Sequence, residues 1–126
     1  MKKLFLGLLL LFSISIFSQE KFVKKYNTFI TSNNYVIDKW KSTDVTVVFN
    51  PKGIKDIVFY FPNGSVRTFH QVKSVQSGKT KNNDSYQIVE CIDDIDGDKV
   101  AIQLFDDDTC LRIIIDAGYY MEFHRD

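Results

Sequence analysis

Few side chains in this sequence could carry out nucleophilic, metal or redox chemistry. Its cysteines are Cys91 and Cys110, and its histidines are His70 and His124. Zinc sites usually bring together more His and Cys ligands than this. The sequence contains no Gly-x-Ser-x-Gly turn, phosphate-binding loop or dinucleotide fingerprint. We therefore predict no catalytic residue, no metal ligand and no cofactor, and we expect the protein not to be an enzyme.

The most acidic stretch, residues 93–98 (DDIDGD), suggests a calcium loop. If Gly97 were the sixth residue of an EF-hand, Ile92 would be first and Gln103 twelfth, where the motif requires Asp and Glu. This mismatch excludes an EF-hand, and Asp-Gly is a strong signal for a hairpin turn. A hairpin is the favoured interpretation, with three weak calcium candidates: Asp94, Asp96 and Asp98.

The possible pairing of the cysteines depends on strand register. If Asp96-Gly97 forms a two-residue turn, Cys91 faces Ile102 and lies on the face of Val89. If Asp107-Asp108 centres the next turn, Cys110 lies on the opposite face. A disulfide needs Cα atoms closer than about 7 Å, which cysteines on opposite faces of different strands do not reach. Separate thiols are favoured, and a one-residue bulge would restore the disulfide alternative.

Neither histidine stands in a recognisable metal motif. His70 alternates with Thr68 and Val72, as a side chain on one face of a strand would, and we interpret it as a sheet histidine with hydrogen-bond partners. His124 shares a face with Tyr120 and Glu122 and is interpreted as a surface residue.

The elements that must position these side chains are strands. From Asp44 onward, β-branched runs and alternating apolar residues are interrupted by turn residues every 8–12 positions. Short connections between them require antiparallel neighbours. The sequence predicts a polar loop at Ser77–Asp84 and a meander of seven strands: Val45–Phe49, Ile57–Phe61, Ser65–Val72, Ser85–Ile92, Lys99–Phe105, Cys110–Ile115 and Tyr119–His124.

Residues 20–43 are ambiguous. We favour a strand over residues 22–30 and another over Tyr35–Trp40, with a turn at Asn33-Asn34. A helix remains the alternative, because Phe22, Tyr26 and Ile30 fit one helical face. The expected fold is all-β, an antiparallel meander of about eight strands that forms a small barrel or a strongly curled sheet.

The first 18 residues have the pattern of a cleavable secretory signal peptide. Two lysines precede an apolar run, and a small residue, Ser18, ends it. We therefore expect an exported protein, periplasmic or secreted, with a single β domain at 19–126 and no membrane span after cleavage. Without the signal the chain has a net charge of −2, which gives no indication of nucleic-acid binding.

The charges of residues 19–126 are unevenly distributed. Residues 19–81 have a net charge of +7, and residues 82–126 have a net charge of −9. Two oppositely charged faces would attract each other within the fold. The alternative is a dipolar surface that guides binding to a partner or self-association.

Aromatic residues are the remaining signal. Most of the fifteen Phe, Tyr and Trp residues after the signal are expected to fill the core. A lumen or mouth lined by rings would instead hold a small apolar ligand, with Trp40, Phe59, Phe61 and Tyr119 as weak ligand-binding candidates.

The order of segments is similar to that of small uncharacterised exported proteins of Bacteroidota. The similarity lies in Trp40 before a polar gap, then Val45–Asn50, then Ile57–Tyr60, then the late meander. It implies no activity, and lipocalin-like barrels are an architectural analogy only. We predict a non-enzymatic binding protein for an unknown protein or small apolar ligand. The alternative is an inhibitor of an extracellular hydrolase that presents Ser77–Asp84.

Overall fold

The computed structural model describes residues 21–51, 55–107 and 109–125. The predicted signal peptide lies outside these residues. Among the described residues no helix is long and apolar enough to cross a membrane. The described part of the chain forms ten strands: β1 (Phe22–Asn33), β2 (Val36–Ile37), β3 (Lys41–Phe49), β4 (Asp56–Tyr60), β5 (Val66–Gln71), β6 (Gln76–Lys79), β7 (Ser85–Asp93), β8 (Lys99–Phe105), β9 (Cys110–Asp116) and β10 (Tyr119–His124).

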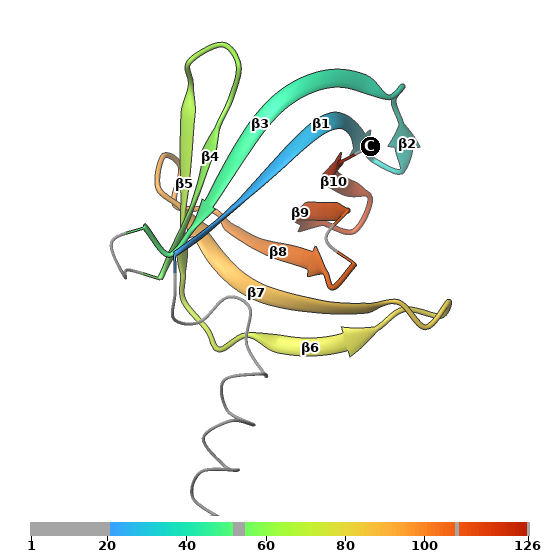
Figure 1. Ribbon diagram of the computed structural model, residues 1–126. Coiled ribbons are helices and arrows are strands. Elements are labelled where there is room, and N and C mark those ends of the chain that lie inside the picture. The colour runs from blue at the N-terminus through green and yellow to red at the C-terminus, as the bar shows by residue number, and fades with distance from the viewer. Residues whose placement is uncertain (1–20, 52–54, 108, 126) are drawn as a thin grey trace, which may run out of the picture.

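Eight of these strands close into an antiparallel barrel in the order β1-β3-β4-β5-β7-β8-β9-β10 (Figure 1). The long strand β1 closes it, because its first half pairs with β3 and its second half pairs with β10. A β-bulge between Tyr26 and Thr28 lies where β1 changes partners. β2 and β6 are short additions to β1 and β7. The all-β barrel expected from the sequence is confirmed.

The described residues of this region, 21–43, form strands β1 and β2 and the start of β3 with no helix, so the helical alternative is wrong. β1 needs an extended backbone because it hydrogen-bonds to strands on both of its edges. The expected strand over Tyr35–Trp40 is reduced to the two residues of β2, because Asn34 and Tyr35 adopt positive φ in the turn before it.

The predicted polar loop Ser77–Asp84 is partly a strand. Gln76–Lys79 pairs with Ser85–Ile88, and a turn over 80–84 connects the two strands. The segment contains no large apolar residue, so its sequence lacks the alternation of apolar and polar residues that would indicate a strand. Its backbone pairing and the ring of Tyr86, which lies against Gly78, hold it in place. The β6–β7 hairpin extends away from the barrel in Figure 1.

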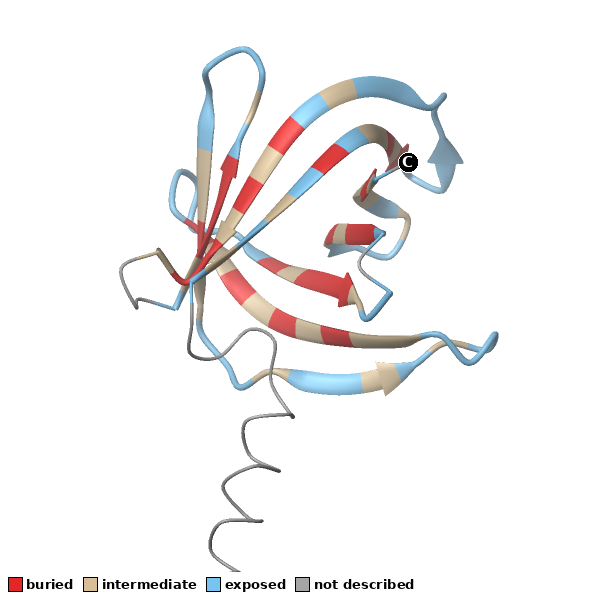
Figure 2. Ribbon diagram, in the orientation of Figure 1, coloured by how far each residue is buried: buried red, intermediate tan, exposed pale blue. Residues whose placement is uncertain are grey.

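The barrel interior is filled with side chains. Buried and less buried residues alternate along β3 and β7, as a strand with one inward face requires (Figure 2). Phe59 lies near the centre, with Phe69 and Phe123 at ring-centroid distances of 5.5 and 5.8 Å. The core comprises Tyr26, Val45, Val47, Phe49, Ile57, Phe59, Phe69, Val89, Cys91, Val100, Ile102, Leu104, Leu111, Ile113 and Phe123.

The oppositely charged parts of the chain meet at the junction of β5 and β7. These two strands share only three residue pairs, against seven between β7 and β8. Ion pairs Arg67–Asp93, His70–Asp94 and Lys73–Glu90 cross the junction. Part of the charge asymmetry therefore acts within the fold, where it supplements a short run of backbone pairing.

Candidate functional site

One end of the barrel, which we call the mouth, contains a pocket of about 150 Å³. Antiparallel order brings the ends of β7 and β9 and the starts of β5, β8 and β10 to this end. Most of the lining is apolar, and the polar lining comes from β5 and the β7–β8 turn. The pocket is lined by Phe61, Arg67, Phe69, Asp93, Asp96, Asp98, Val100, Ile113, Ile115 and Met121.

Arg67 and Asp93 form the polar centre of the mouth. The guanidinium of Arg67 donates to Asp93, whose side chain is only 3% exposed. Burial alone would raise the pKa of Asp93, but hydrogen bonds from Arg67 and the backbone N–H of Ile95 outweigh it and lower that pKa. Asp93 is therefore a carboxylate at neutral pH. The Nε of Arg67 is buried and has no hydrogen-bond partner among the described residues.

The carboxylates at the mouth outnumber the cations that line it. Asp96 lies 3.6 Å from the same guanidinium, and Asp98 also lines the pocket. Arg67 itself lies over the ring of Phe69, with 6.0 Å between its Cζ and the ring centroid. Three acidic side chains against one guanidinium give the pocket a negative rim above an apolar wall, which favours a positively charged ligand.

A wider groove of about 510 Å³ adjoins the pocket and shares Phe61 and Arg67 with it. Its remaining lining comes from β1, β3, the start of β5 and the β4–β5 and β7–β8 turns: Phe29, Ser42, Thr43, Pro62, Asn63, Ser65, Val66 and Ile95. Phe61 and Arg67 thus form a shared wall, and a ligand in the pocket could extend past them into the groove.

The four aromatic ligand-binding candidates do not converge on the mouth. Phe61 lines both the pocket and the groove. Phe59 is fully buried in the core. Trp40 is half exposed and packs edge-on against His124 at 4.6 Å between ring centroids, and Tyr119 begins β10 after the β9–β10 turn. The sequence did not point to Arg67 or Asp93, because their pairing depends on the β5–β7 register.

Two of the three calcium candidates, Asp94 and Asp96, contact basic side chains of the protein itself. Asp94 lies 2.8 Å from Nε2 of His70, and Asp96 lies near Arg67. Nδ1 of His70 lies 2.7 Å from Asp56, so this histidine bridges two carboxylates. Hydrogen bonds to Asp94 and Asp56 raise the pKa of His70. The interpretation of His70 as a sheet histidine with partners is confirmed, and Gly97 with positive φ occupies the expected hairpin turn.

The two cysteines are separate thiols, as the register argument favoured. Cys91 faces Val100 rather than Ile102, because the turn at 93–98 is longer than the two residues assumed. That shift of two residues keeps Cys91 on the inner face, in the core. Burial raises the pKa of both thiols to about 12, so neither is a ready nucleophile at neutral pH.

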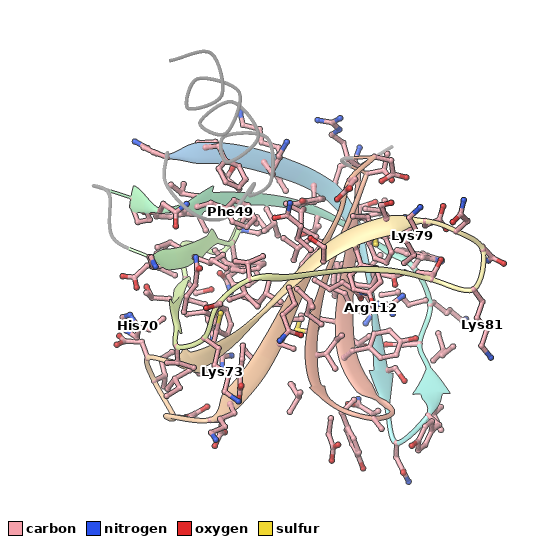
Figure 3. The ribbon with its side chains drawn as sticks, turned by 90° about the horizontal axis from the view of Figure 1, so that it is seen from below. Phe49, His70, Lys73, Lys79, Lys81 and Arg112 are labelled. Carbon is pink, nitrogen blue, oxygen red and sulfur yellow. The ribbon has the colours of Figure 1, made fainter. Side chains whose placement is uncertain are left out.

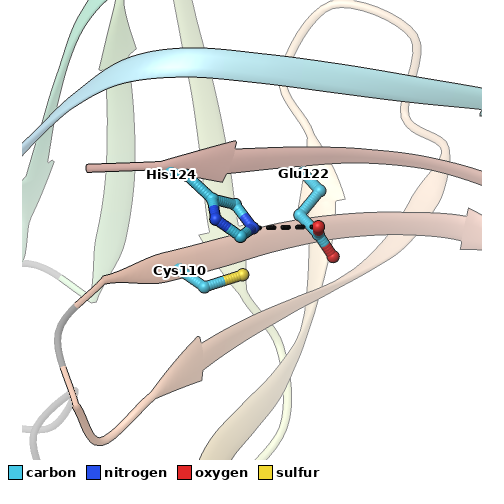
Figure 4. A group of neighbouring side chains, drawn as sticks. All are labelled: Cys110, Glu122 and His124. Atoms are coloured by element: carbon cyan, nitrogen blue, oxygen red, sulfur yellow. Dashed lines mark hydrogen bonds and ion pairs between the residues drawn. The ribbon is translucent and has the colours of Figure 1, made fainter. Parts of the chain in front are cut away.

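A group of potential metal ligands lies on the outer face of the barrel. Cys110, Glu122 and His124 come together on β9 and β10, with their ligand atoms within 4.8 Å of one another (Figure 4). The alternation of side chains had placed Glu122 and His124 on one face of a strand, but it did not connect them with Cys110. Extending the strand register across the β9–β10 turn would have paired Cys110 with His124.

Comparison with known proteins adds no relative. No family model, curated protein or solved structure matches this chain. Any functional inference therefore depends on the site geometry.

Proposed function

We propose that this chain is an exported, non-enzymatic binding protein that takes a small amphipathic cation into the barrel mouth. The ligand would carry one apolar group and one positive charge. The observation that supports this proposal is the mouth pocket, in which an apolar wall is overlaid by three carboxylates and a single guanidinium.

Pocket size limits the apolar group to about one ring. A cavity of about 150 Å³ is known to accept a molecule the size of benzene. Deeper entry is blocked because Phe59, below the pocket walls, is fully buried and packs against Phe69. The barrel is thus suited to binding at its mouth rather than in a central lumen.

Burial of one ring contributes only about 2–3 kcal/mol to binding. This is less than the roughly 4 kcal/mol that a millimolar dissociation constant represents. The rest would come from the carboxylates and from contacts in the adjoining groove. Asp98 is the best placed of the acidic residues to meet a ligand cation, because it has no ion-pair partner among the described side chains.

Calorimetric titration with matched probes tests this proposal. Phenethylamine should bind more tightly than phenylacetate, which has a similar ring and the opposite charge. The variant Ile115→Trp should lose amine binding, because Ile115 is exposed and lines the pocket. Val72→Trp is the matched control, since Val72 is also exposed and lies outside the residues lining the pocket and groove. Equal binding of both probes, or equal loss in both variants, would contradict the proposal.

Inhibition of an extracellular hydrolase is a second candidate function, favoured by the form of the β6–β7 hairpin. Its turn is closed by hydrogen bonds from Asn83 N–H to the Thr80 carbonyl and from Thr80 N–H to the Asp84 carbonyl. Lys79 and Lys81 lie on this hairpin (Figure 3). An ordered, projecting loop loses little conformational entropy on binding.

Shortening the hairpin tests this second function. Replacing residues 80–84 with Asn-Gly should abolish inhibition of a sensitive protease and leave the melting temperature nearly unchanged. A change at the tip of the β4–β5 hairpin, Asn63→Ser, serves as the control. Inhibition that survives the shortening would exclude this loop.

A further inference from the structure

The outer face of the β9–β10 hairpin brings together a thiol, a carboxylate and an imidazole. Cys110 and His124 are directly opposite each other in the register, and Glu122 lies two residues before His124 on the same strand. Because side chains alternate along a strand, all three project from the same side of the sheet. A cysteine and a histidine opposite each other, with a third ligand on the adjacent same-face position, are within reach of a single ion.

The distances are close to those of a metal site. His124 Nε2 lies 2.9 Å from Glu122 Oε2, and all three ligand atoms lie within 4.8 Å of one another. In a tetrahedral zinc site, bonds of about 2.0–2.3 Å place the ligand atoms about 3.4 Å apart. Small side-chain rotations would therefore bring these atoms to bonding distance, with the imidazole–carboxylate hydrogen bond giving way to the ion.

The surroundings of Glu122 leave one carboxylate oxygen available for an ion. Arg112 donates from Nε to Oε1 of Glu122 at 2.8 Å, and it orients the carboxylate as the outer-shell partners of metal ligands do. Its charge is also held by the ring of Tyr120, 4.9 Å from Cζ to the centroid. Oε2 is the oxygen that faces His124.

We propose that Cys110, Glu122 and His124 form a binding site for a zinc-type transition-metal ion. Sulfur, imidazole and carboxylate ligands together suit Zn²⁺ or Co²⁺ and do not suit Ca²⁺ or Mg²⁺, which take oxygen ligands. On binding, the Cys110 thiol loses its proton to the solvent and the thiolate sulfur bonds to the ion. With three protein ligands, a fourth position is left for water or a ligand atom from a partner.

Cobalt and zinc titrations of the unmodified protein test this proposal first. Co²⁺ should produce a sulfur-to-cobalt charge-transfer band and the visible bands of tetrahedral coordination, and Zn²⁺ should abolish both. In imidazole NMR spectra, Zn²⁺ should shift the nitrogen signals of His124. His70, which is engaged by Asp56 and Asp94, is an internal control and should remain unchanged.

Matched cysteine variants then assign the sulfur ligand. Cys110→Ser should lower Zn²⁺ affinity by more than the 10- to 100-fold typical of outer-shell changes. Cys91→Ser, a change at the buried thiol inside the barrel, should leave it unaltered. If either variant fails to fold, the NMR assignment on the unmodified protein still decides. A protein without the charge-transfer band, or with zinc shifts at His70 rather than His124, would overturn the proposal.

Discussion

The two ends of this barrel differ in the side chains that lie there. At the end opposite the mouth, Phe22 stacks on Phe49, with ring centroids 4.3 Å apart and an interplanar angle of 6°. At the mouth, Phe61 and Phe69 line a pocket instead, together with the ion pair of Arg67 and Asp93. One end carries a stacked pair of rings, and the other has a charged pair beside its pocket.

The difference suggests which end contributes more to stability. Stacked rings bury apolar surface, which is favourable. An ion pair with one partner almost fully buried contributes less, because desolvation offsets much of the attraction between the charges. An end that keeps such a pair beside an apolar pocket is therefore the better candidate for binding, and substitutions at each end should behave differently.

The largest loss of unfolding free energy is expected at the end opposite the mouth. Phe49→Ala should lower the free energy of unfolding by about 3–5 kcal/mol, because it removes a fully buried ring and leaves a cavity. Phe61→Ala at the mouth should lower it by only about 1–2 kcal/mol, since Phe61 is only partly buried. Urea unfolding measures both, and equal losses would show that the two ends are packed alike.

The ion pair at the mouth should have an intermediate effect. Arg67→Met should cost about 1–3 kcal/mol of unfolding free energy, because it leaves the buried Asp93 carboxylate without its cation. Adding Asp93→Asn should recover most of this loss, because the amide oxygen can still accept from Ile95 and carries no charge. If the loss of unfolding free energy in the double variant equalled the sum of the losses in the two single variants, Arg67 and Asp93 would not be coupled.

The smallest expected effect concerns His70 and pH. Because its pKa is raised by Asp94 and Asp56, the stability it contributes is fully present below the unfolded pKa of about 6.5 and is lost as pH rises through the higher folded value. Its half-exposed position limits this contribution to about 1 kcal/mol. The unfolding free energy of the unmodified protein minus that of His70→Gln should be greater at pH 6 than at pH 9. A difference in unfolding free energy that does not change with pH would contradict the bridging of Asp56 and Asp94 by His70.

Strand positions were largely predictable, because the seven later strands carry β-branched and apolar runs separated by turns. The register was less so: Cys91 pairs with Val100 because the preceding turn is longer than its Asp-Gly signal implied. The ion pair at the mouth was not predictable, although Phe61, Asp96 and Asp98, which also line the pocket, had been singled out. Arg67 and Asp93 are far apart in sequence, and only the three-pair junction of β5 and β7 brings them together. The same holds for Cys110 and His124, whose proximity depends on the β9–β10 register.

Methyl NMR during titration with phenethylamine tests binding at the mouth. We expect progressive shifts at the mouth methyls of Val100, Ile113, Ile115 and Met121, with no change at Leu104 and Leu111 deep in the core. Shifts spread evenly over both groups, or confined to the core, would contradict a binding site at the mouth.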